Sequence, residues 1–181
     1  MVYIFLAEGF EETEALAPAD CLRRCGIEAI TVGVGGKIIK SSHGFEIAAD
    51  ITESEVVLSE KLEMIILPGG MPGTLNLEKS QTVQKAIDYC AENGIYIGAI
   101  CAAPSILGHK GLLKNHRAVC FKGFESHLEG AETGTEPVCV SGKFITSRGM
   151  GTAVEFGLKL VEVLISEERS LELRESIMCP Q

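Results

Sequence analysis

Short apolar runs recur along this chain and alternate with stretches of helical periodicity. The runs predict strands at Val2–Ala7, Ala29–Val34, Met64–Leu67 and Ile95–Ile100. A run without polar alternation is typical of a strand that is buried on both faces, as in a parallel sheet. The helical patterns cover Glu12–Cys25, Ser80–Asn93, Thr152–Ile165 and Glu167–Ile177. Strands that alternate with helices predict an α/β fold, with a mostly parallel sheet and helices on both of its faces.

Two further segments complete the predicted organisation. Val138–Val140 and Phe144–Thr146 are expected to form a two-stranded ribbon that turns at Ser141-Gly142. The acidic segment Gly123–Glu136 is expected to be a long surface loop. Because the chain contains no linker, repeat or low-complexity stretch, residues 1–181 are expected to form a single domain.

Charge and hydropathy limit the possible partners. The chain carries 25 Asp+Glu against 16 Lys+Arg, a net charge of −9, which argues against nucleic-acid binding because that requires a basic face. The apolar run at the N-terminus is too short to span a membrane, and no basic segment precedes it as in a signal peptide. We therefore expect a cytoplasmic protein without nucleic-acid or membrane partners.

The cysteines are expected to be free thiols. There are seven of them, an odd number, and no C-x-x-C spacing or neighbouring histidine cluster suggests a zinc site. An ordinary-sized domain with this cysteine pattern is typical of a reducing compartment, and we expect no metal.

Cys101 lies where a predicted strand passes into a helix, with Ala99 and Ala103 two positions away on either side. Small residues at these positions are what a nucleophile elbow requires, because larger side chains would clash in so tight a turn. The following helix N-terminus is expected to stabilise a thiolate and to lower the pKa of Cys101. A buried core cysteine at a strand end is the alternative interpretation.

Two other segments follow predicted strands and could complete a site at the same edge of the sheet. In Leu67-Pro68-Gly69-Gly70, the N–H of Gly70 could join that of Ala102 as an oxyanion donor, although an ordinary loop is the simpler explanation. In Glu11-Glu12-Thr13-Glu14, the first two carboxylates are expected to be solvated, whereas a helical step could turn Glu14 inward. A protonated Glu14 could then donate a hydrogen bond to the sulfur.

These segments, together with Thr146-Ser147-Arg148-Gly149-Met150-Gly151-Thr152, resemble the ThiJ/PfpI superfamily, and within it the branch of the Parkinson-disease-associated protein deglycase. The four segments are in family order and run from the first strand to the penultimate helix. The resemblance implies a flavodoxin-like three-layer sandwich and a homodimer. It implies that Cys101 is the nucleophile, Glu14 its protonated partner, and Gly70 and Ala102 the backbone oxyanion donors. For Arg148 it implies a structural or dimer-side role.

Two departures from the family pattern narrow the chemistry. A histidine often lies near the nucleophile in this branch, but here Phe121 or Lys122 stands at that position and His116 comes too early. Ala102 follows Cys101, where protease-like members carry a histidine, and so peptidase activity is not expected. The four histidines are interpreted as surface or loop residues. Among them, His127 in the acidic loop is the best candidate for a catalytic base.

Two functions of different classes remain open on the sequence. The first is glyoxalase-like or deglycase-like conversion of a reactive carbonyl or glycated substrate, without a cofactor, through a Cys101 hemithioacetal and proton transfer by Glu14. The second is a redox sensor or stress chaperone in which Cys101 is oxidised without turnover. Cys120 could have an accessory redox role if its segment lies near the elbow.

Overall fold

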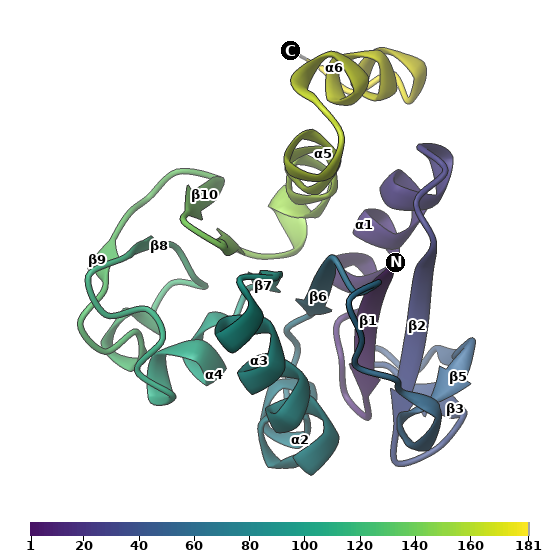
Figure 1. Ribbon diagram of the computed structural model, residues 1–181, viewed down its shortest axis with the longest axis vertical. Helices are drawn as coiled ribbons and strands as arrows, with labels where there is room; N and C mark the ends of the chain where they lie inside the picture. Colours follow the sequence, from purple (N-terminus) through teal and green to yellow (C-terminus); the bar gives the residue numbers. More distant parts are fainter. Residues whose placement is uncertain (181) are drawn as a thin grey trace.

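The computed structural model describes residues 1–180 and is built around a seven-stranded sheet (Figure 1). Its strands are β1 (Val2–Ala7), β2 (Ala29–Val34), β5 (Ile51–Thr52), β6 (Met64–Leu67), β7 (Tyr96–Ile100), β10 (Val138–Ser141) and β11 (Phe144–Ser147). They lie in the order β10-β11-β7-β6-β1-β2-β5. All neighbours are parallel except β10 and β11, which form the predicted antiparallel ribbon at one edge.

Helices cover both faces of this sheet, which confirms the predicted flavodoxin-like sandwich (Figure 1). On one face lie α1 (Glu12–Arg24), α5 (Ala153–Leu164) and α6 (Glu167–Ser176). On the other lie α2 (Gly73–Lys79), α3 (Gln81–Asn93) and α4 (Pro104–His109). Within residues 1–180, no helix combines the length and the apolar character needed to cross a bilayer.

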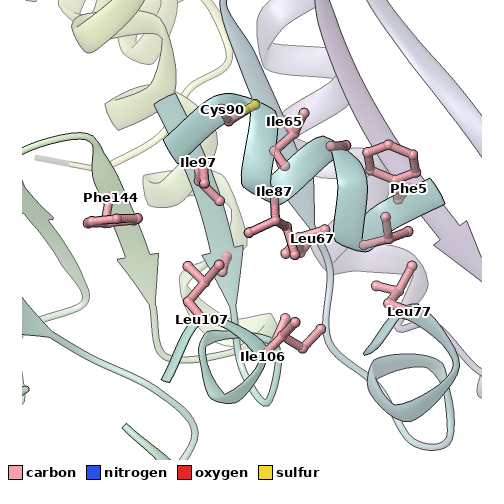
Figure 2. Packing of buried hydrophobic residues seen from close by; sticks show 14 of the residues in the cluster. Phe5, Ile65, Leu67, Leu77, Ile87, Cys90, Ile97, Ile106, Leu107 and Phe144 are labelled. Atoms are coloured by element: carbon pink, nitrogen blue, oxygen red, sulfur yellow. The ribbon is translucent and has the colours of Figure 1, made fainter. Parts of the chain in front are cut away.

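Each face of the sheet has its own hydrophobic core, because successive side chains of a strand point to opposite sides. In β1, Phe5 packs with the α2, α3 and α4 side, while Ile4 and Leu6 pack with the α1 and α5 side. Figure 2 shows the first of these cores, with Phe5, Ile65 and Leu67 of the sheet facing Ile87 of α3. The apolar runs of the sequence are therefore strands buried on both faces.

The predicted ends of α3 are confirmed. The side chain of Ser80 caps the helix by accepting a hydrogen bond from the backbone N–H of Val83, 3.3 Å away. Gly94 ends it in the left-handed conformation, with φ 64°, which glycine adopts without steric cost. Both signals are local, and so the sequence alone was enough to place them.

Several short elements were not predicted. They include α2, the hairpin of β3 (Ile38–Lys40) and β4 (Glu46–Ala48), and the turn η1 (Glu53–Glu55). The expected loop Gly123–Glu136 is also more ordered than predicted. It contains the turn η2 (Glu125–His127) and β9 (Glu132–Thr133), and β9 pairs in parallel with β8 (Arg117–Ala118).

Gly157 allows α5 to pack closely against α1. A Cβ atom at this position would lie 2.8 Å from Sγ of Cys21 and 3.0 Å from Cα of Pro18. Since Cβ atoms essentially never approach other heavy atoms that closely, only glycine fits at the crossing without a shift of one helix.

We expect Gly157→Ala to destabilise the protein by about 1–2 kcal/mol, measured by urea unfolding. Alanine favours a helix by about 1 kcal/mol over glycine, but contacts as short as 2.8 Å place the overpacking cost at about 2–3 kcal/mol, in the upper part of its usual range. Gly151→Ala is the matched control, because a Cβ atom there meets nothing within 4 Å. The close-packing argument is wrong if both variants unfold at the urea concentration of the unsubstituted protein.

Candidate active site

The carboxyl ends of three neighbouring strands carry the segments of interest. The loop after β1 leads into α1, the loop after β6 contains Gly69 and Gly70, and β7 is followed directly by Cys101. The strand order reverses here, because the chain builds outward from β1 to β2 and β5 and then returns to place β6 on the other side of β1. In open α/β sheets, such a switch point is where ligands bind.

Cys101 has the backbone geometry of a nucleophile elbow. Its φ is 65°, a left-handed conformation that is uncommon for a residue with a side chain. Ala99 and Ala103 beside it are both fully buried. The turn is held from two sides: the N–H of Cys101 donates to the carbonyl of Ser147 (2.9 Å), and its own carbonyl accepts from the N–H of Phe121 (2.8 Å). The thiol is partly exposed.

The structure turns Glu14 inward and brings it against this thiol. Glu14 is the third residue of α1, and its side chain is only 1% exposed. Its carboxylate accepts a hydrogen bond from the N–H of Gly69 (2.9 Å) and lies against the side chain of Cys101, close enough for each group to shift the pKa of the other. Two residues 87 positions apart in the sequence therefore form one titrating pair.

Glu11 and Glu12 were expected to be solvated, but both are only partly exposed and both have partners within the protein. Glu11 caps α1, because its Oε2 accepts from the N–H of Glu14 (2.7 Å). Glu12 pairs with the exposed His43, at 3.0 Å between Oε1 and Nδ1. The side chains of Glu11, Glu12 and His43 lie together, and their potential metal-ligand atoms are within 4.8 Å of one another.

Gly69 is a site residue that the sequence argument missed. A Cβ atom on it would lie 2.6 Å from Cβ of Cys101 and 2.6 Å from Oε2 of Glu14. The absence of a side chain here is what lets the thiol and the carboxyl meet. The register explains the position, because β6 pairs Leu67 with Ala99, and two residues further on Gly69 lies beside Cys101.

The two expected oxyanion donors lie at the sulfur. The backbone N–H groups of Gly70 and Ala102 both act to lower the pKa of the Cys101 thiol, because they stabilise its anion. Gly70 has φ 88°, and a Cβ atom on it would lie 2.4 Å from the backbone nitrogen of Glu11. Glycine is thus required at this position for both conformation and space.

Burial dominates the electrostatics of the pair. It raises the pKa of Glu14 to about 7, although the hydrogen bonds from Cys101 and from the N–H of Gly69 oppose the shift. Burial, followed by the charge of Glu14, raises the pKa of Cys101 to about 12, against the opposing effect of the Gly70 and Ala102 N–H groups. The expected low pKa of Cys101 is therefore not found while Glu14 is ionised. A thiolate forms in this site when its proton passes to Glu14, because the pair then keeps a single negative charge.

No histidine is found in contact with Cys101 among the described residues. Phe121 lies near the pair instead: it is 50% exposed, and its ring is beside Gly149, which in turn lies close to both Cys101 and Glu14. His116 is hydrogen-bonded to Ser141 (3.0 Å). His127, the histidine that the sequence favoured as a catalytic base, is hydrogen-bonded to His109 (3.0 Å). The base available to the thiol is Glu14.

Arg148 and Cys120 border the elbow without touching the pair. The exposed Arg148 donates from Nη1 to the carbonyl of Thr135 (3.1 Å) and so supports the segment that leads into β10. Cys120 is 6% exposed and immediately precedes Phe121, whose N–H binds the carbonyl of Cys101. Its segment lies at the elbow, as the sequence suggested, but burial raises the pKa of Cys120 to about 11.

Comparison with known proteins gives consistent matches. The model of the DJ-1/PfpI family matches residues 1–163. Protein dj-1beta of Drosophila melanogaster is 33% identical over 178 residues, which cover 97% of this chain and 95% of that protein. The glutathione-independent glyoxalase DJR-1.2 of Caenorhabditis elegans is 32% identical, over 92% of this chain and 89% of that protein. The structure of oxidized Toxoplasma gondii DJ-1 superposes with a TM-score of 0.94 at 34% identity, covering 99% of this chain and 98% of that one.

We expect Glu14→Gln to stabilise the protein increasingly as the pH rises from 5 to 8. Glu14 binds its proton more tightly in the folded chain, with a pKa of about 7 against 4.5 in the unfolded chain. Stability is therefore lost as the pH rises from about 4.5 to about 7, and over pH 5 to 8 this loss amounts to about 2–3 kcal/mol. Glutamine does not titrate, so urea unfolding should show its advantage growing by about that amount.

Glu8→Gln is the control for this measurement, because it removes the same charge from an exposed residue in the loop after β1. Its unfolding free energy should follow that of the unsubstituted protein across the pH range. Parallel pH profiles for Glu14→Gln and Glu8→Gln would mean that the Glu14 carboxyl is not buried against the thiol.

Proposed function

Because this chain belongs to the DJ-1/PfpI family, we propose that it is a cofactor-independent thiol enzyme that converts small reactive carbonyls. The observation that carries the proposal is the contact between the thiol of Cys101 and the carboxyl of Glu14. A carboxyl whose pKa is about 7 can both accept and return a proton near neutral pH, which general acid–base catalysis requires. The relative named as a glutathione-independent glyoxalase supports carbonyl chemistry.

For a 2-oxoaldehyde such as methylglyoxal, the sulfur of Cys101 adds to the aldehyde carbon while the thiol proton passes to Glu14. The product is a hemithioacetal, and the N–H groups of Gly70 and Ala102 stabilise the negative charge that develops in this step. Glu14 first returns its proton to the hemithioacetal oxygen, and its carboxylate then takes the proton from the former aldehyde carbon and delivers it to the neighbouring carbon. The hydroxyl proton of the hemithioacetal passes to the neighbouring ketone oxygen, and a thioester is left on the sulfur. Water hydrolyses the thioester, releases a 2-hydroxy acid and restores the thiol.

These steps consume one water molecule per substrate and no oxidant. One substrate carbon is oxidised from aldehyde to acid while its neighbour is reduced from ketone to alcohol, so the electrons balance within the substrate. No group other than the side chains and backbone of the site is needed. A glycated substrate could enter the same route if its carbonyl carbon reaches the sulfur.

A second candidate function is redox sensing or a stress-chaperone role through oxidation of Cys101. The partly exposed thiol supports it, and so does the similarity to an oxidized DJ-1 structure. A sulfinate at Cys101 would accept hydrogen bonds from a protonated Glu14 and from the backbone N–H groups. This function requires no turnover, and that difference separates it from the enzyme.

Steady-state consumption of methylglyoxal by the pure protein, without glutathione, tests the enzyme directly. We expect continuous formation of lactate, loss of this activity in Cys101→Ser, and a fall in kcat of about 100-fold or more in Glu14→Gln, in line with general acid–base contributions of about 10²–10⁴-fold. Glu12→Gln, which removes a carboxylate paired with His43, should retain the kcat of the unsubstituted protein. Stoichiometric consumption that stops after one equivalent would reject the enzyme in favour of the sensor.

We also propose that the protein is a homodimer, as the resemblance implies. Leu16 of α1 is 38% exposed and Val154 of α5 is 39% exposed, although both belong to helices that already bury one face on the sheet. An isologous contact would cover such surplus apolar surface.

Light scattering at low micromolar concentration should give about twice the 19.4 kDa of one chain. Leu16→Glu should lower the mass to one chain, because it places a charge in the proposed contact. Leu171→Glu should not, because it changes an exposed leucine on α6, a helix outside the proposed contact of α1 and α5. A single-chain mass for the unsubstituted protein would contradict the dimer.

A further inference from the structure

Three of the seven cysteines lie on α1 and the C-terminal tail, outside the proposed active site. Cys21 and Cys25 lie one helical turn apart at the end of α1, and Cys179 follows α6. All three pack against the same hydrophobic core. Figure 1 shows α6 on the side of the sheet that carries α1 and α5. Cys179 lies beyond residues 1–163, which the family model matches.

Cys21 and Cys179 face a common space. Both line a cavity of about 400 Å³ whose walls come from α1, α5 and the tail, and Ile177 and Pro180 complete the tail side. Cys179 is also close enough for a charge on it to contribute to the raised pKa of Cys21. Cys25, by contrast, does not line this cavity and lies close to Arg169 of α6.

The two thiols of the cavity differ in chemical character. Cys21 is 4% exposed, and burial raises its pKa to about 11, with smaller contributions from Asp20, Cys25 and Cys179. Cys179 is partly exposed and lies next to Met178, which is 88% exposed. The guanidinium of Arg174 donates from Nη1 to Sγ of Cys179 (3.5 Å), and it would stabilise negative charge on this sulfur during attack on an oxidant.

We propose that Cys21 and Cys179 form a reversible disulfide when the protein meets a hydroperoxide. With hydrogen peroxide, the sulfur of Cys179 attacks one oxygen, the O–O bond breaks, and the thiol proton leaves on the other oxygen as water, so that Cys179 becomes the sulfenic acid. The thiol of Cys21 then attacks that sulfur, its proton leaves with the hydroxyl as a second water, and the S–S bond forms. Two thiols are oxidised and one peroxide is reduced to two waters.

The disulfide ties the tail to α1, the helix whose first turn carries Glu14. It is a second thiol site, independent of Cys101, and it would exist whether or not the protein turns over carbonyls. Because a disulfide requires α-carbons within about 7 Å, its formation also measures how closely the tail approaches α1.

Trypsin provides a direct test, because cleavage after Arg23, Arg24 and Arg174 places the three cysteines in separate peptides, 1–23, 25–37 and 175–181. The full chain is treated with a few equivalents of hydrogen peroxide, free thiols are blocked with iodoacetamide, and the non-reduced digest is analysed by mass spectrometry. We expect peptide 1–23 joined to 175–181, with a mass 2 Da below the sum of the two. Dithiothreitol should separate them.

Variants isolate this site from the catalytic thiol. Cys101→Ala should form the same cross-link, and so should Cys25→Ala, the matched control one turn from Cys21. Cys179→Ser should leave Cys21 alkylatable after unfolding. The proposal is overturned if Cys179 joins peptide 25–37, if the cross-link joins two chains on a non-reducing gel, or if Cys101 is fully oxidised while Cys21 and Cys179 both remain free.

Discussion

The close approach of Glu14, Gly69 and Cys101 couples the ends of three strands, and it is possible only because Gly69 has no side chain. A carboxyl removed from water here retains its proton up to about pH 7, which costs stability at higher pH. The same desolvation holds the thiol protonated until Glu14 can take its proton. The site therefore keeps one negative charge on two groups, and the backbone N–H groups of Gly70 and Ala102 support that charge when it lies on sulfur.

Helix α1 connects the functions proposed for this protein. Its first turn carries Glu14, its exposed side carries Leu16, and its last turns carry the thiol of Cys21 at the cavity shared with the tail. Gly157 of α5 holds this helix at close range. A shift of α1 relative to the sheet would move the backbone of Glu14 and so alter the contact between its carboxyl and Cys101.

Most of the fold could be predicted because its signals are local. Short apolar runs predict the strands β1, β2, β6 and β7, and a serine cap and a terminal glycine mark the ends of α3. The hairpin β3–β4 has no comparable signal, since only Ile39 of β3 is buried and its pairing is decided by contact with the rest of the chain. The sequence of Gly123–Glu136 predicts a loop for the same reason, because its two-residue strand exists only by pairing with β8.

For the site, the sequence by itself determined the elbow at Cys101, through the alanines on either side. It also made Glu14 and Gly70 candidate site residues, because both follow predicted strands. Tertiary structure decided the rest. The register of β6 against β7 placed Gly69 beside the thiol, which no local pattern specifies. Burial reversed the expected pKa of Cys101, because the cost of desolvating a charge is set by atoms that surround it in space, whatever their distance along the chain.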